Sequence, residues 1–258
     1  MDAFAKLQKL AQQASAADIM TIVSGPAERE NVLGKMLVIP HGQEPDGQLL
    51  DPVFTAKLLA FRDAHEWIKP QVFQVEYHGN YQCFWDRLAM KPRALILGAG
   101  HISQPLAELL AVVDYEVVIA DDRPDFANAL RFPQAAQVIC QSFEKLMLQL
   151  PLAEFSAIVI VTRGHRYDLD CLRVALLQAS GYIGMIGSKR RVASILTLLQ
   201  EEGISRERLS RLHAPIGLDI GAQSPAEIAV SIVAELIAFM RGGKHLPLSE
   251  QWRSCHGS

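Results

Sequence analysis

The sequence predicts an α/β protein with a doubly wound parallel sheet in its C-terminal part and a smaller α+β domain before it. From Arg93 onward, short apolar runs alternate with longer segments of helical period, which is typical of βαβ units. The earlier residues carry strand-like runs joined by hairpin-like turns. The polar sequence Met90-Lys91-Pro92 separates the two patterns, so we expect domains at 1–90 and 91–258.

The C-terminal part contains five apolar runs of strand length. They occupy residues 94–97, 116–120, 137–140, 157–162 and 182–187. The run at 157–162 (AIVIVT) is apolar along its length, as a central buried strand should be. Ser188 can cap a helix that stops at Gly203, and Ser224 can open a capping box for a last helix that ends at Gly242. That last helix is apolar all round, which predicts its burial and completes a Rossmann-like domain.

The first ninety residues predict a smaller unit of mixed structure. Helical period covers 3–14 and 51–65, and strand-like stretches occupy 19–25, 35–40, 71–77 and 81–85. The turn sequence H-G-N joins the last two stretches. These elements are typical of an α+β domain.

Composition narrows the classes of partner. The chain has 258 residues, half of them apolar, and a net charge of −3. It therefore lacks the excess of Lys and Arg that is typical of nucleic-acid-binding proteins. No apolar run approaches the ~18 residues that span a bilayer, and the first residues do not resemble a signal peptide, so we expect a cytoplasmic protein.

The four cysteines lack C-x-x-C spacing, which argues against a zinc site, and Cys140 and Cys171 are expected to be buried.

Basic, glycine-containing loops follow the first, fourth and fifth predicted strands. Their sequences are G-A-G-H, T-R-G-H-R-Y-D and G-S-K-R-R. Because the carboxyl ends of parallel strands share one edge of the sheet, these loops should meet there. The candidate site residues that they contribute are Gly98, Gly100, His101, Arg163, His165, Arg166, Gly187, Ser188, Lys189, Arg190 and Arg191. Glycine backbone amides, helix N-termini and arginine guanidinium groups are all suited to binding an anion. The alternative is that two of the three basic side chains in the last loop simply face water.

The loop at 98–101 also resembles a dinucleotide-binding turn, with Asp121 placed to accept a ribose hydroxyl. Ser103 stands where a third small residue is usual, so a purely structural turn remains the alternative. His101 and His165 could bind an oxyanion or transfer a proton, whereas Asp168 and Asp170 are assigned to a helix dipole.

The stretch H-A-P-I-G-L-D-I-G-A at 213–222 is apolar for a loop between helices. We expect it to pack over the sheet and wall the crevice. Asp219 would then be buried and would need a cationic partner, for which the arginines of the basic loops are candidates.

Assembled, these motifs resemble the XdhC/CoxI family of accessory proteins for molybdenum hydroxylases. The matching segments are G-A-G-H with its downstream D-D-R-P, T-R-G-H-R-Y-D, I-G-S-K-R-R and P-I-G-L-D-I-G-A-x-S-P-A-E-I-A-V-S-I. They cover most of 93–241, and residues 23–38 look like a diverged form of the family's smaller N-terminal domain.

The resemblance implies a protein that binds molybdenum cofactor (molybdopterin) during sulfuration and delivers it to an apo-hydroxylase such as xanthine dehydrogenase. A cysteine desulfurase and a second copy of the chain are the other partners that we expect. One departure concerns the N-terminal domain, which lacks the cysteine followed by glycines of many members. Two alternatives stay open, an NAD(P)- or FAD-binding oxidoreductase that uses Gly98, Gly100 and Asp121, and a scaffold between desulfurase and target. No catalytic residue is assigned.

Overall fold

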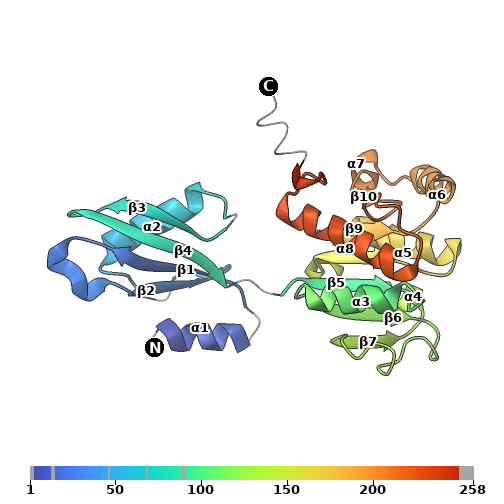
Figure 1. Ribbon diagram of the computed structural model, residues 1–258, viewed down its shortest axis with the longest axis horizontal. Helices are drawn as coiled ribbons and strands as arrows, with labels where there is room; N and C mark the ends of the chain where they lie inside the picture. The colour runs from blue at the N-terminus through green and yellow to red at the C-terminus, as the bar shows by residue number, and fades with distance from the viewer. Residues whose placement is uncertain (1–2, 13–14, 46, 68, 89–90, 250–258) are drawn as a thin grey trace. The chain divides into compact units, whose positions relative to one another are not determined.

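A computed structural model describes residues 3–12, 15–45, 47–67, 69–88 and 91–249, except for the side chains of residues 12, 28–30, 165 and 166. The chain divides into two compact units, Met1–Lys91 and Pro92–Ser258, which are described separately (Figure 1). The first contains an antiparallel sheet and the second a parallel one, so the predicted α/β class is confirmed.

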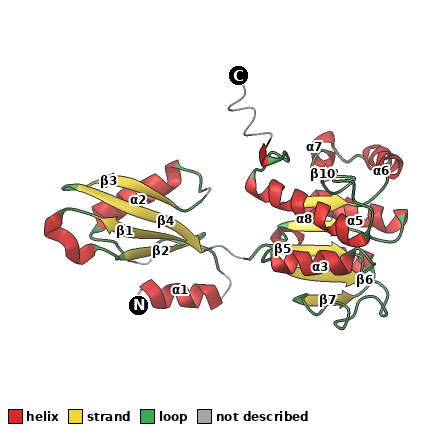
Figure 2. Cartoon of the chain, viewed as in Figure 1, coloured by secondary structure: helices red, strands yellow, loops and turns green. Residues whose placement is uncertain are grey.

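Unit 1 is built on a four-stranded antiparallel sheet in the order β2-β1-β4-β3 (Figure 2). The strands are β1 (Ala17–Ser24), β2 (Met36–Pro40), β3 (Gln71–Glu76) and β4 (Asn80–Leu88), with helices α1 (Ala3–Gln12), η1 (Ala27–Val32) and α2 (Pro52–Ala64). Asp51 caps α2 by accepting hydrogen bonds from the amides of Val53 and Phe54. Phe54 and Leu58 of α2 are buried against the sheet, which forms the main core of this unit.

Unit 2 is built on a six-stranded sheet in the order β10-β9-β8-β5-β6-β7, and every neighbouring pair is parallel. The strands are β5 (Arg93–Leu97), β6 (Glu116–Asp121), β7 (Gln137–Cys140), β8 (Ala157–Ile160), β9 (Tyr182–Met185) and β10 (Leu212–His213). The strand order reverses between β5 and β8, which is where such sheets place a ligand.

The sequence predicted five of these strands and missed β10. This strand has two residues and pairs with Ile183 and Gly184 of β9. Two residues carry no detectable alternation, and the first part of the stretch at 213–222 was therefore wrongly predicted to be loop only.

Helices cover both faces of the parallel sheet (Figure 1). One face packs against α3 (Ser103–Val112) and α8 (Pro225–Arg241), and the other against α4 (Phe143–Gln149), α5 (His165–Gln178) and α6 (Lys189–Glu201). Two short helices, η2 (Leu152–Glu154) and α7 (Arg206–Leu209), lie in the connections. All four residues of β8 are fully buried, as the apolar run predicted.

The last helix, α8, has the predicted capping box between Ser224 and Glu227, and ends at Gly242 with a left-handed backbone. The prediction that it is buried all round is wrong. Its inner face packs in the core, whereas Val230 and Ile237 on the outer face are 47% and 41% exposed, because the sheet and α3 cover one side only. None of the helices among the described residues is long and apolar enough to cross a membrane.

Candidate functional site

The turn after β5 is held in a conformation that only glycine accommodates. Gly98 has a φ of +111°, and a Cβ placed on it would lie 2.5 Å from the carbonyl oxygen of Val161. The buried Ser103 hydroxyl donates a hydrogen bond of 2.6 Å to the Gly98 carbonyl. Ser103 therefore closes the turn from within, while Gly100 borders open space and His101 is exposed.

The two glycines of this turn should respond differently to alanine. Gly98→Ala forces a side chain against the backbone of Val161, and we expect it to lower the free energy of unfolding by about 2–3 kcal/mol. Gly100→Ala is the matched control, because a Cβ there meets nothing within 4 Å. Urea denaturation of both variants checks this, and equal losses would contradict the close approach.

Asp121 at the end of β6 is buried and directed back into the protein. Its Oδ2 accepts hydrogen bonds from the Ala99 amide (2.8 Å) and Arg123 Nη2 (2.9 Å). Its Oδ1 accepts from the Arg123 amide (3.0 Å) and Nε (2.8 Å). A carboxylate has about four acceptor positions. All four are taken by Ala99 and Arg123, so none is left for a ribose hydroxyl.

Ionised Asp121 contributes to stability. Burial acts to raise its pKa, but the hydrogen bonds from Arg123 and from the Ala99 amide outweigh burial and lower the pKa to about 2. Because the unfolded value is near 3.9, this contribution of about 2 kcal/mol is present above pH 4 and lost as the pH falls toward 2. Unfolding free energies of the wild type and Asp121→Asn, measured from pH 6 to 2, should therefore converge at the acid end. A constant difference would contradict the lowered pKa.

A buried carboxylate, Asp168, joins the starts of α5 and α6. Its Oδ1 accepts a hydrogen bond from the Thr162 hydroxyl, and its Oδ2 forms an ion pair with Arg191 Nη2. Asp168 is fully buried, whereas Arg191 is partly exposed. The predicted contact residue Arg191 thus directs its guanidinium inward, and its charge is largely balanced by Asp168.

The role of Asp168 was not predicted from the sequence, although a signal was present. The buried residues Cys171, Leu172 and Ala175 lie three, four and seven positions after Asp168. Asp168 therefore belongs to the buried stripe of α5, and a carboxylate in that stripe needs a cationic partner.

Arg163 is held in place by two neighbours. Its Nη2 donates to Asp122 Oδ2 (2.9 Å) and to the Tyr167 hydroxyl (3.0 Å), and its guanidinium carbon lies 5.1 Å from the Tyr167 ring centre. Asp122 Oδ1 is buried without a hydrogen-bond partner among the described residues. The ion pair between Arg163 and Asp122 connects the loops after β6 and β8, and it balances the positive charge of Arg163.

Among the side chains that the structure describes, three exposed ones remain as cationic or hydrogen-bonding groups at this edge. His101, Lys189 and Arg190 are exposed, and within the described part of the chain none of them has an ion-pair partner. Ser188 caps α6 through the Arg191 amide (3.3 Å), and Gly187 precedes it. The side chains of His165 and Arg166 lie outside the described residues. The loops after β5, β8 and β9 share one edge because these strands are neighbours in the parallel sheet.

The expectation for Asp219 is wrong. Its side chain is exposed rather than buried, and no ion pair joins it to the described arginines. The loop does pack inward through Ile216, which is buried in the core, and the Gly217 amide donates to Glu235 of α8 (2.7 Å). The chain turns outward after these anchors, so the acidic residue faces solvent.

Two of the three described cysteines are buried. Cys171 is buried as predicted, but Cys140 is exposed because β7 is an edge strand. Cys83, which lies in unit 1, is fully buried, and burial raises the pKa of its thiol to about 11. Cys255 lies outside the described residues. Among the described residues, no group of three or more His, Cys, Asp and Glu side chains is placed to hold a metal.

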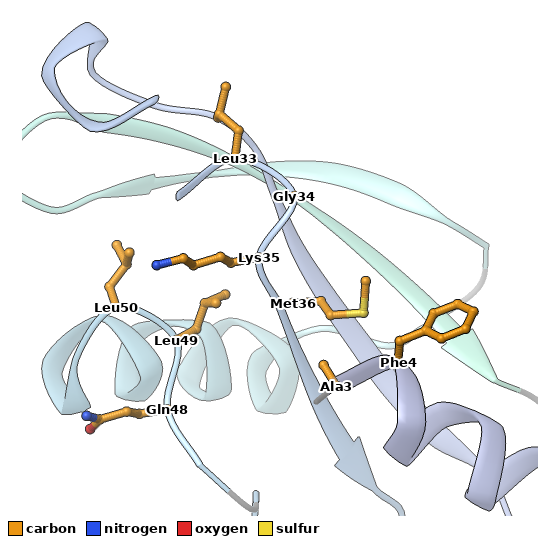
Figure 3. A pocket seen from close by; sticks show the side chains of 9 residues that line it. All are labelled: Ala3, Phe4, Leu33, Gly34, Lys35, Met36, Gln48, Leu49 and Leu50. Atoms are coloured by element: carbon orange, nitrogen blue, oxygen red, sulfur yellow. The ribbon is translucent and has the colours of Figure 1, made fainter. Parts of the chain in front are cut away.

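Unit 1 has an open cavity of its own, of about 620 Å³ (Figure 3). Its lining residues are Ala3, Phe4, Leu33, Gly34, Lys35, Met36, Gln48, Leu49 and Leu50. Lys35 is the charged group of this set, and its amine extends toward Leu50 in Figure 3. None of the sequence-predicted site residues lines this cavity.

Comparison with known proteins places these features in a family context. Residues 94–236 match the family model described as the XdhC Rossmann domain. A protein of Bacillus subtilis (strain 168) that is named as a probable xanthine dehydrogenase subunit is 34% identical over 154 residues, which cover 60% of this chain and 44% of that protein.

Two proteins of Escherichia coli (strain K12) also match. The uncharacterized protein YqeB is 32% identical over 160 residues, covering 62% of this chain and 29% of that protein. The molybdenum cofactor insertion chaperone PaoD is 26% identical over 144 residues, covering 56% and 39%. The chain thus aligns with less than half the length of each of these curated relatives.

A solved structure matches nearly the whole chain. The crystal structure described as a xanthine dehydrogenase from Bacillus halodurans aligns with a TM-score of 0.56 and 20% identity, over 95% of this chain and 97% of that one. At this identity the match shows a shared fold.

Proposed function

The chain belongs to the family defined by the XdhC Rossmann domain, and from this premise we propose that it binds molybdenum cofactor and inserts it into a molybdenum hydroxylase. The name of PaoD as a molybdenum cofactor insertion chaperone, and the xanthine dehydrogenase name of the Bacillus subtilis relative, support this role. The proposal treats the cofactor as cargo that the chain holds and releases.

The observation that carries the proposal is the group of exposed side chains at the carboxyl edge of the parallel sheet that have no ion-pair partner among the described residues. Lys189 and Arg190 are exposed at the N-terminus of α6, where positive charge is unfavourable next to the helix dipole unless an anion offsets it. Such a site fits the phosphate of a pterin cofactor. The chain as a whole is weakly acidic, so this local positive charge does not follow from composition.

The remaining residues of the edge suit the rest of the cargo. Gly100 borders open space, so a ligand can approach the backbone of the turn after β5. His101 is exposed beside it and can hydrogen-bond an oxyanionic metal centre. Asp168 and Asp122 hold Arg191 and Arg163 in place and thereby fix the loops that carry the contact residues.

The alternative cargo, NAD(P) or FAD, is less well supported by the geometry. A dinucleotide site of this fold uses a carboxylate at the end of the second strand for the ribose. Asp121 occupies that position, but Arg123 and Ala99 take up its acceptor positions. We therefore propose the pterin cofactor over a redox dinucleotide.

We further propose that sulfuration is performed by a cysteine desulfurase partner while this chain holds the cofactor. Unit 1 corresponds in this proposal to the family's smaller N-terminal domain. Its cysteine, Cys83, is buried with a raised pKa, so the sulfur would come from the partner rather than from a thiolate of this unit.

Reconstitution tests the proposed function. Purified protein preloaded with sulfurated molybdenum cofactor is mixed with apo-xanthine dehydrogenase, and hydroxylase activity is followed against free sulfurated cofactor at the same concentration. We expect faster activation from the loaded protein, since bound cofactor is protected and delivered. Activation no faster than with free cofactor would overturn the insertion role, and loaded bovine serum albumin controls for nonspecific protection.

A further inference from the structure

Arg131, in the connection between β6 and β7, reaches the glycine turn that follows β5. Its Nη1 donates hydrogen bonds to the carbonyl oxygens of Ala99 (3.1 Å) and Phe126 (3.3 Å). Its Nη2 donates to Oε1 of Gln104 (3.1 Å), and its guanidinium carbon lies 4.8 Å from the Phe126 ring centre. The guanidinium group is therefore fixed between the glycine turn and the first turn of α3.

The positive charge of Arg131 is not balanced by an acid. Within the described part of unit 2, no ion pair joins Arg131 to a carboxylate, although Arg123, Arg163 and Arg191 each have one. Carbonyl oxygens satisfy the N–H groups of a guanidinium but leave its charge in place. Because a charge that is partly removed from water is costly until it is paired, the partly buried Arg131 favours the binding of an anion.

A second arginine that donates to a carbonyl shows the contrast. Arg211 Nη2 donates to the carbonyl of Ala179, the residue that ends α5. The C-terminal end of a helix has a partial negative charge, which compensates the charge of Arg211. Arg131 instead contacts Gln104 in the first turn of α3, where the partial charge is positive. The helix dipole therefore adds to the unbalanced charge of Arg131.

Arg131 keeps donors for a ligand and lies beside open space. A guanidinium has five N–H groups, and the three hydrogen bonds leave Nε–H and one N–H of Nη2 without a partner among the described residues. Gly100 follows the Ala99 carbonyl that Arg131 binds, and a Cβ on Gly100 would meet nothing within 4 Å. The exposed His101 comes next. These groups suit a tetrahedral oxyanion.

We propose that Arg131, the backbone of Gly100 and the side chain of His101 form a second anion-binding subsite, separate from Lys189 and Arg190. The two subsites belong to helices on opposite faces of the sheet, α3 and α6, and follow strands that are separated by β8. At the usual strand spacing this is about 10 Å along the sheet, too far for one oxyanion to contact both.

A ligand that fills both subsites has two separate anionic groups. On the proposed function, the Arg131 subsite takes the oxyanionic metal end of the cofactor, and the start of α6 takes its phosphate. This orientation rests on the proposed function, whereas the subsite itself rests on the contacts of Arg131 alone.

Titration with inorganic phosphate, followed by NMR of the deuterated, isotope-labelled protein, tests the subsite without the cofactor. In the wild type we expect saturable shifts of the Gly100 and His101 amide signals and of the Arg131 Nε–H signal. Arg131→Gln should raise the phosphate Kd reported by the two amides by about 10-fold, and should leave the Kd reported at the start of α6 unchanged. Lys189→Ala with Arg190→Ala should have the reverse effect.

Two control variants separate the charge of Arg131 from its hydrogen bonds. Gln104→Ala removes one partner of the guanidinium but keeps the charge, so the phosphate Kd should change by less than about threefold. Arg208→Gln, at an exposed position on α7, removes the same charge elsewhere and should leave the Kd unchanged.

The proposal is overturned by the absence of saturable shifts at Gly100, His101 and Arg131 in the wild type, or by equal losses in Arg131→Gln and Arg208→Gln. Because phosphate is the probe, either result is independent of whether the chain inserts the cofactor. Failure of reconstitution with intact phosphate binding at Arg131 would remove the proposed function and leave the subsite.

Discussion

Replacing Asp168 by alanine is expected to lower the free energy of unfolding of unit 2 by about 3–5 kcal/mol. The substitution removes a fully buried carboxylate that accepts from Thr162 and forms an ion pair with Arg191. The partly buried guanidinium of Arg191 then loses its ion-pair partner, and the Thr162 hydroxyl keeps only its longer hydrogen bond to the Gly164 carbonyl (3.3 Å). Leaving a buried polar group without its partner costs more than the pair itself contributes. Urea denaturation followed by circular dichroism measures the loss.

A double-mutant cycle separates the pair from simple loss of packing. Arg191→Met removes the cation without the carboxylate, and the double variant Asp168→Ala with Arg191→Met should be more stable than the sum of the two single losses predicts. Asp168→Asn, which keeps the hydrogen bond to Thr162, should lose less than Asp168→Ala. Strictly additive losses would contradict a direct interaction between Asp168 and Arg191.

Removing the two exposed cations at the start of α6 should have the largest effect on binding. We expect Lys189→Ala with Arg190→Ala to weaken molybdopterin binding by about 100-fold or more, since hydrogen bonds to charged groups contribute about 1.5–3 kcal/mol each. The melting temperature should stay within a few degrees of the wild type, because both side chains are exposed and have no ion-pair partner in the described part of unit 2. Fluorescence titration and thermal unfolding measure the two quantities.

A matched control keeps the same change in net charge at a different place. Arg206→Ala with Arg208→Ala removes two exposed cations from α7, which precedes β10 and so lies away from the carboxyl edge of the sheet. This variant should bind almost as well as the wild type. Equal loss in the two double variants would mean that overall charge, rather than the site at α6, governs binding.

The architecture of unit 2 could be predicted because its elements are strongly patterned. The wholly apolar run of β8 indicated a central strand, and the capping residues Ser188 and Ser224 marked the starts of α6 and α8. The match to the XdhC Rossmann domain confirms the resemblance that the loop motifs carried. Each of these signals is local in sequence, which is why it could be detected without the structure.

The errors arose where a residue's role depends on distant contacts. Asp168 and Asp219 are both acidic residues close to a loop, and only the fold shows that the first is buried and the second exposed. Asp121 stands at the position of a ribose-binding carboxylate, but its partner Arg123 two residues later turns it inward. Counting basic residues likewise overestimated the free charge, because Arg163 and Arg191 are paired with acids.

Direct titration of the purified protein with molybdopterin, in parallel with NAD, NADP and FAD, is the most direct test of the central claim. Tryptophan fluorescence or calorimetry measures each Kd at the same salt concentration. We predict saturable, stoichiometric binding of molybdopterin, weakened by Lys189→Ala with Arg190→Ala, and much weaker binding of the dinucleotides. Micromolar binding of a dinucleotide with no binding of molybdopterin would contradict the proposed function.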